Sequence, residues 1–265
     1  MTLTALQRRV LQAIASNRDT SSYVAGGAAL NRTRLRVSDD LDIFIDPGAS
    51  LAEIAERDIA AIRSAGLDVT DFANHYGLIA EATVSDGHAQ TQIQWQDETR
   101  RRFLPVVSDQ EFGVRLSDAD LAINKVLAAA FRRAARDFVD LVAIQRDYAP
   151  LGPLVWAACA KTELGPVALI DRIRQNARSL SDQEYATVRM AGGRVRKAEL
   201  MSSLEEMLAK AEAFQKEAPP EHYGKLFLDT RGSPIAATKA AIDHGAVIPI
   251  PLSEYGPIVP VVLPG

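Results

Sequence analysis

"YVAGGAALNRTRLRVSDDLDIFID", residues 23–46, contains two predicted strands separated by a glycine turn and a short helix. The chain leaves the first strand through Gly26 and Gly27. In the second strand apolar residues alternate with Asp40 and Asp42, so the two aspartates are expected on one face, two residues apart. Two like charges at this spacing repel each other, and aspartate is a poor strand former. The pattern therefore indicates a group that compensates the two charges.

A divalent cation is the simplest compensating group. Mg²⁺ takes a few carboxylates together with substrate phosphates and keeps water in its other positions. The Gly26-Gly27 turn offers backbone N–H groups to a phosphate at the start of the following helix, and Ser38 adds a hydroxyl two residues before Asp40. Each feature alone is weak, but together they predict a site for a metal-bound nucleoside triphosphate.

The first part of the chain mixes helix and strand signals. A helix is expected over residues 3–17, and a second begins after the cap residue Ser50 and ends at Gly66. Asp86-Gly87 predicts a hairpin turn. The expected strands cover residues 22–25, 40–45, 77–85 and 89–96, with an edge strand at 112–117.

The second part of the chain is predicted to be mostly helical. Ser117 is a helix cap with Asp118 and Asp120 in the first turn, and helical patterns continue to about residue 215. We therefore expect one mixed domain, residues 1–116, and one helical domain, residues 117–265.

Composition places the chain among ordinary globular proteins, with 47% hydrophobic and 24% charged residues. The net charge of −4 does not favour a general nucleic-acid binder, although arginines cluster locally. The single cysteine, Cys159, allows no disulfide within the chain and is expected in the core. With no signal peptide and no long apolar run, we expect a cytoplasmic protein without a membrane partner.

Two motifs carry a resemblance to a known family. The order Gly-Gly, short helix, Asp-x-Asp strand resembles the signature of the DNA polymerase β-like nucleotidyltransferases, and "RVSDDLDIF", residues 36–44, is similar to the Arg-x-Ser-x-Asp-Leu-Asp motif of the AbiE-type, or MenT-like, toxins. Downstream, "DLAINKVLAAAFRRAARDFVDLVAI", residues 120–144, resembles the family's Asp-Leu-x-x-x-Lys-x-x-Ala helix followed by Arg-Asp-x-x-Asp-Leu. The resemblance covers roughly residues 20–145.

This resemblance implies a fold and an activity. The fold is α+β: a polymerase β-like nucleotidyltransferase core, a mixed sheet with helices on one side, followed by a mostly helical C-terminal half. The family members are toxins of type IV toxin–antitoxin systems, so a cognate antitoxin is an expected partner. The implied reaction transfers a nucleotide from an NTP to an RNA acceptor, the 3′ end of tRNA above all, and so blocks translation.

The resemblance also assigns roles to residues. It implies that Asp40 and Asp42 are catalytic and hold Mg²⁺ or Mn²⁺, and that Lys125 is a point charge on the triphosphate. Asp137 or Asp140 would orient Lys125 or the attacking hydroxyl, and both are expected to join Lys125 in the cleft. The residues expected to bind the nucleotide are Gly26, Gly27, Arg36, Ser38 and Lys125.

Helix geometry limits the second motif. On one straight helix Lys125 and Asp140 would lie roughly 22 Å apart, too far to share a site. Either the helix breaks near residues 132–136, or only Lys125 belongs to the site. The family places its two motifs on consecutive helices, and we therefore expect the break.

One departure from the family leaves other functions open. Many nucleotidyltransferases carry a third carboxylate on a neighbouring strand, where this chain has Gln92 or Gln94. An amide is a poorer Mg²⁺ ligand than a carboxylate and is no base. The alternatives are a nucleotidyltransferase for a small molecule, such as an antibiotic, and a non-catalytic nucleotide-binding module.

Overall fold

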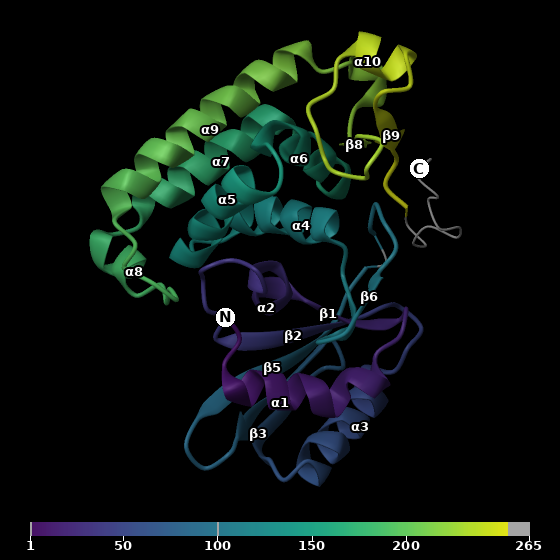
Figure 1. The fold of residues 1–265 in the computed structure, drawn as a ribbon, viewed down its shortest axis with the longest axis vertical. Helices are drawn as coiled ribbons and strands as arrows, with labels where there is room; N and C mark the ends of the chain where they lie inside the picture. Colours follow the sequence, from purple (N-terminus) through teal and green to yellow (C-terminus); the bar gives the residue numbers. More distant parts are fainter. Residues whose placement is uncertain (1, 100, 254–265) are drawn as a thin grey trace. The chain divides into compact units, whose positions relative to one another are not determined.

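The computed structural model describes residues 2–99 and 101–253 (Figure 1). The chain divides into two compact units, the first comprising residues 1–100 and 105–121 and the second residues 101–104 and 122–265. The division falls within helix α4 (Asp118–Phe131).

The first unit is built on a mixed seven-stranded sheet with the strand order β3-β4-β5-β2-β1-β7-β6. The pairs β2–β5 and β1–β7 are parallel, and the other neighbouring strands are antiparallel. The strand carrying the two aspartates, β2, therefore lies in the interior of the sheet. The strands are β1 (Ser22–Ala25), β2 (Asp40–Ile45), β3 (Asp68–His75), β4 (Ile79–Ser85), β5 (Gln90–Asp97), β6 (Val107–Asp109) and β7 (Gly113–Arg115).

One face of this sheet is apolar and buried. Helices α1 (Ala5–Ile14) and α3 (Leu51–Ser64) pack against it. In β2 and β5 the fully buried hydrophobic side chains come from alternate residues, namely Leu41, Ile43, Ile45, Ile93 and Trp95. The alternation expected from the sequence is confirmed, and the architecture is α+β with a mixed sheet.

Side-chain caps fix where these two helices begin. Thr4 accepts a hydrogen bond from the backbone of Gln7, whose side chain in turn accepts one from the backbone of Thr4. Ser50 accepts from the backbone N–H of Glu53, as the sequence predicted.

A buried carboxylate on α3, that of Asp58, binds both the segment before β1 and the sheet. Nη2 of Arg18 lies 2.5 and 2.6 Å from the two carboxylate oxygens of Asp58, and neither side chain is exposed. Trp95 donates its indole N–H to the same carboxylate at 2.8 Å. Because both charges are removed from water, losing either partner would leave the other uncompensated.

Strand β3 was not predicted from the sequence. The expected hairpin between β4 and β5 is present, with Asp86 bonded to Ala89 across the turn. Strand β3, however, is an edge strand whose side chains are mostly exposed, and its register shifts between Thr70 and Ala73, next to Asp71 at φ 53°. The irregularity removes the two-residue periodicity on which strand prediction depends.

The second unit is mostly helical. Helix α9 runs along α5, α6 and α7 (Figure 1). Helix α6 is apolar and buried along its whole length, as expected for a helix enclosed by others. Besides α4, the helices of this unit are α5 (Ala135–Asp147), α6 (Leu151–Ala158), α7 (Pro166–Ser179), α8 (Asp182–Ala186), α9 (Lys197–Glu217) and α10 (Lys239–Asp243).

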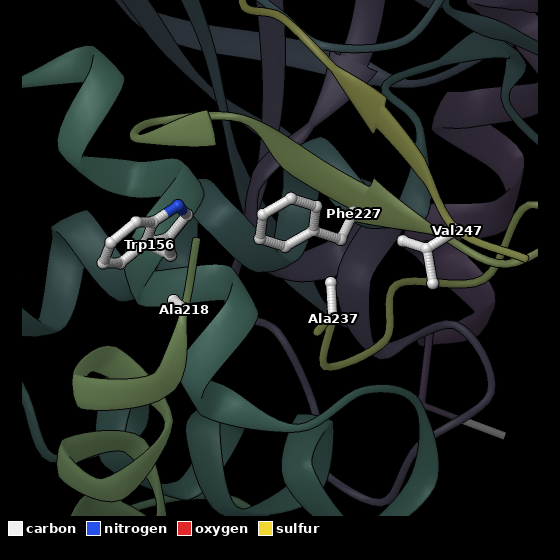
Figure 2. Packing of buried hydrophobic residues seen from close by; sticks show 5 residues of the cluster. All are labelled: Trp156, Ala218, Phe227, Ala237 and Val247. Atoms are coloured by element: carbon white, nitrogen blue, oxygen red, sulfur yellow. The ribbon is translucent and has the colours of Figure 1, made fainter. Parts of the chain in front are cut away.

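A small two-stranded sheet packs beside α6 in this helical unit. Strands β8 (Leu226–Leu228) and β9 (Ile248–Ile250) pair antiparallel, a feature that the sequence did not predict because each strand has only three residues. Figure 2 shows the apolar cluster beneath them, in which Trp156 of α6 and Phe227 of β8 lie with Ala218, Ala237 and Val247. Within the described residues no helix is both long and apolar enough to cross a membrane. The proline-rich segment 254–265 lies outside the described residues.

Candidate active site

The glycine turn lies directly against the strand that carries the aspartates. Ala25, the last residue of β1, pairs with Asp42 of β2, and α2 (Gly26–Asn31) begins at the next residue. Gly26 has a φ of +63°, and a Cβ atom placed on it would lie 1.7 Å from Oδ2 of Asp42. Both the backbone conformation and the available space therefore require glycine.

The second glycine lies against two buried polar side chains. A Cβ atom on Gly27 would lie 2.5 Å from Nη2 of Arg36 and 2.7 Å from Oγ of Ser38. Arg36 and Ser38 are 3% and 1% exposed, so both are held in place by the protein. The structure thus brings the predicted residues Gly26, Gly27, Arg36, Ser38 and Asp42 together.

The two aspartates lie on the face of the sheet opposite α1 and α3. Asp40 and Asp42 are both partly exposed, whereas the residues between and after them are buried. Oγ of Ser38 donates a hydrogen bond to Oδ1 of Asp40 at 3.0 Å. The backbone carbonyl of Ser38 accepts from the side chain of Gln7 at 2.9 Å, which fixes the loop before β2.

Amides extend this polar face beyond the aspartates. On β5, Gln92 lies opposite Asp40 and Gln94 lies opposite Asp42. The next acidic residue in the same row is Glu81 on β4, opposite Gln94, and its carboxylate lies 3.2 Å from Nε2 of His75. Among the described residues, no group of three or more His, Cys, Asp or Glu is arranged to hold a metal. Two carboxylates, such as those of Asp40 and Asp42, are the kind of donor set that Mg²⁺ takes when phosphates and water complete its coordination.

The second predicted motif forms a buried ionic cluster. Helix α4 ends at Phe131 and α5 begins at Ala135, so the expected break is confirmed. Because of this break, Nζ of Lys125 reaches both carboxylates, at 2.8 Å from Oδ1 of Asp137 and 3.0 Å from Oδ2 of Asp140. Lys125 is 7% exposed at its side chain and the two aspartates are fully buried.

Arg132 is a member of this cluster that the sequence did not predict. Its Nε lies 2.6 Å from Oδ2 of Asp137 and its Nη2 lies 2.9 Å from Oδ1. Burial alone would raise the pKa of Asp137, but the hydrogen bonds and positive charges of Arg132 and Lys125 outweigh burial and lower this pKa to about 2. Asp137 is therefore ionised at neutral pH. Arg132 stands between two helices, where no helical spacing relates it to Asp137.

The predicted residues thus fall into two clusters. The glycine turn and the two aspartates belong to the first unit, and the lysine cluster belongs to the second, since α4 passes from one unit to the other after Leu121.

Comparison with solved structures shows which fold this is. The chain is similar to a candidate nucleotidyltransferase from H. pylori, with a TM-score of 0.54 and 18% identity over 80% of this chain and 94% of that chain. It is also similar to the nucleotidyltransferase toxin MenT4 from Mycobacterium tuberculosis, with a TM-score of 0.51 and 16% identity over 81% and 83% of the two chains. No family model and no curated protein matches the sequence. The chain has the nucleotidyltransferase fold, as its two motifs predicted.

Proposed function

We propose that this protein is a metal-dependent nucleotidyltransferase toxin that transfers NMP from an NTP to an RNA acceptor, the 3′ end of tRNA, and thereby blocks translation. One observation carries the proposal: Gly26 and Gly27 pack against Asp42, Arg36 and Ser38 with no room for a side chain. A turn that keeps backbone N–H groups beside carboxylates serves a ligand that needs both, such as a metal-bound triphosphate. The similarity to a toxin makes a cognate antitoxin part of the proposal.

The side chains of the first unit have distinct roles in this reaction. Asp40 and Asp42 would hold Mg²⁺ or Mn²⁺. When bound, this cation would offset part of the negative charge of the triphosphate. The backbone N–H groups of Gly26 and Gly27 and the guanidinium of Arg36 bind phosphate oxygens, and Ser38 orients Asp40 through its hydrogen bond. The acceptor hydroxyl would then lose its proton to water, its oxygen would form a bond to the α-phosphorus, and the bond from this phosphorus to pyrophosphate would break.

For Lys125 we propose a fixed cationic position within the second unit. Asp137 and Asp140 hold its ammonium at 2.8 and 3.0 Å, so the position of this charge is set by residues of its own unit.

The decisive experiment measures nucleotide transfer. Labelled NTPs are incubated with the protein and Mg²⁺, with and without tRNA, and the acceptor is analysed for added nucleotide. We expect label on tRNA with the unmodified protein and none with Asp42→Asn. The matched control is Asp39→Asn, which removes an exposed carboxylate beside the site and should leave transfer intact.

The same experiment separates the alternative functions. Label on a small molecule but not on RNA would replace the proposed acceptor with an antibiotic-type substrate. Binding of NTP without transfer would indicate a nucleotide-binding module, which Gln92 and Gln94 opposite the aspartates would explain. The toxin role is tested by expression in a bacterial host, where the unmodified protein should slow growth and Asp42→Asn should not.

A further inference from the structure

Two buried side chains hold the segment that leads into β2. Residues 37–39 belong to no helix or strand. Nε2 of Gln7, on α1, donates to the backbone carbonyl of Ser38 at 2.9 Å. Oγ1 of Thr91, on β5, donates to the backbone carbonyl of Asp39 at 3.1 Å. Both peptide carbonyls directly before the first aspartate of the strand are therefore bonded to side chains from other elements.

The two side chains form one hydrogen-bonded network. Nε2 of Gln7 also lies 3.3 Å from Oγ1 of Thr91, and Oε1 of Gln7 accepts from the backbone N–H of Thr4 at 2.9 Å. Gln7 is 1% exposed and Thr91 is 5% exposed. A buried polar group that loses its partner cannot turn to water instead, so each bond in this network resists a change of position.

The network lies on the face of the sheet away from the aspartates. Thr91 and Ile93 are buried and share one face of β5, and Gln92 between them is exposed and lies opposite Asp40. Helix α1, which carries Gln7, contacts β5 and packs on the buried face. A ligand at Asp40 therefore lies across the sheet from the network, and the network can influence that ligand only through the backbone.

The backbone held in this way carries two groups of the glycine–aspartate site. Oγ of Ser38 donates to Oδ1 of Asp40 at 3.0 Å, and a Cβ atom on Gly27 would lie 2.7 Å from the same hydroxyl. The site is thus closely packed around Ser38. A displacement of about 1 Å at reacting groups is enough to disturb a site strongly, so the position of these carbonyls matters for binding.

We propose that Gln7 and Thr91 are positioning residues for the nucleotide site. From the far face of the sheet they hold the backbone that carries Ser38 and continues into Asp40. They touch no ligand themselves. The inference rests on the proposed function, because it takes Mg²⁺ and an NTP as the ligand at Asp40.

The chain offers matched variants for a test. Thr91→Val removes the hydroxyl and keeps the shape of the side chain, whereas Thr91→Ser keeps the hydroxyl. Gln7→Met removes the amide at similar length. The control is Thr4→Ala, which removes the hydroxyl that accepts from the backbone N–H of Gln7 at 3.1 Å and leaves the side-chain amide of Gln7 in place.

Three measurements are made on each variant. Calorimetry gives the affinity for a non-hydrolysable NTP analogue with Mg²⁺, a thermal melt gives stability, and hydrogen exchange gives the opening of residues 37–40. We expect Thr91→Val and Gln7→Met to weaken binding by about tenfold, the lower end for groups that support a metal site from outside, and to speed exchange in residues 37–40.

The other two variants separate positioning from general stability. Thr91→Ser should bind almost as tightly as the unmodified protein, because its hydroxyl can still donate to the carbonyl of Asp39. Thr4→Ala should melt at a lower temperature, because α1 loses its cap, and should bind as tightly as the unmodified protein. Its exchange in residues 37–40 should be unchanged.

Several results would overturn the inference. These are unchanged affinity or unchanged exchange in Thr91→Val, binding by Thr91→Ser that is as weak as that of Thr91→Val, and equal weakening in Thr4→Ala and Gln7→Met. If Gln7→Met does not fold, the comparison of Thr91→Val with Thr91→Ser decides alone. If the unmodified protein binds no NTP analogue, the proposed function fails together with the inference, and if it binds but Thr91→Val binds equally well, only the inference fails.

Discussion

Gly26 and Asp42 are packed so closely that a β-carbon on the glycine would lie 1.7 Å from Oδ2 of the aspartate. This contact predicts that Gly26→Ala displaces the carboxylate, in addition to the cost of placing alanine at a φ of +63°. We expect a loss of stability of roughly 2–4 kcal/mol and loss of nucleotide binding. Urea unfolding and calorimetry measure the two effects.

Gly87→Ala provides the control for backbone strain. Gly87 has a φ of +85°, and no atom lies within 4 Å of its added Cβ, so only strain of about 1 kcal/mol is expected there. If both variants lose the same stability and Gly26→Ala still binds nucleotide, close packing against Asp42 has no functional consequence.

The two aspartates should repel each other when no cation is bound. Asp40 and Asp42 lie on one face of β2, and two charges about 7 Å apart in a largely aqueous environment interact by roughly 0.5 kcal/mol. Asp42→Asn should therefore melt at the same or a slightly higher temperature than the unmodified protein without metal. A melting temperature lower by several degrees would show that Asp42 is needed for the fold itself.

Lys125→Met should destabilise the second unit. The substitution leaves Asp140 without its ammonium partner and leaves Asp137 with Arg132, which corresponds to roughly 3–5 kcal/mol for a broken buried pair. Lys210→Met is the comparison, because Lys210 pairs with Glu206 at 2.6 Å on the surface, where the two side chains are 67% and 69% exposed and the pair contributes little to stability. Equal loss of stability in the two variants, measured by urea unfolding, would contradict the importance of the charge cluster.

Asp137 should make stability depend on acid. Its pKa is about 2 in the folded protein, compared with 3.8 for an ordinary aspartate, which stands for the unfolded state. As the pH falls, the unfolded state therefore binds the proton first. The resulting stability, about 2 kcal/mol, is fully present above about pH 4 and is lost as the pH falls through 2. Urea unfolding between pH 5 and 2.5 should show a steeper loss for the unmodified protein than for Asp137→Asn. Identical slopes would refute the lowered pKa.

Gln94 stands opposite Asp42 at the position where a third carboxylate would add charge. We predict that the unmodified protein binds one Mg²⁺ firmly with an NTP analogue, and that Gln94→Asp tightens metal binding. Gln96→Asp adds the same charge opposite Phe44, one step further along the strand, and should have a smaller effect. Calorimetry with Mg²⁺ would decide this, and two equally tight metals in the unmodified protein would show that a different side chain supplies the missing charge.

Sequence patterns within short segments predicted the strand, turn and helix start that depend only on residues close together in the chain. The alternation in residues 40–45, the glycine turn and the cap at Ser50 each follow from one short segment, and the structure contains all three. The break between α4 and α5 was expected from the family resemblance, which places the two motifs on consecutive helices, whereas helix geometry alone left open that only Lys125 belongs to the site.

Features that depend on tertiary contacts were not predictable in the same way. Strand β3 has mostly exposed side chains and an irregular register, so its pairing with β4 leaves no regular pattern. The contact between Arg132 and Asp137 arises only once the chain has turned between two helices. In both cases the partner, and not the segment itself, determines the structure.

The position of β2 between β1 and β5 also has a kinetic consequence. Its backbone is hydrogen-bonded on both sides, so its amide protons should exchange with solvent only in the rarest openings of the first unit. Asp40 and Asp42 are therefore attached to backbone that fluctuates little. The edge strand β3, by contrast, is bonded on one side and should exchange much earlier, so that gradual warming would loosen the rim of the sheet long before it displaces the carboxylates.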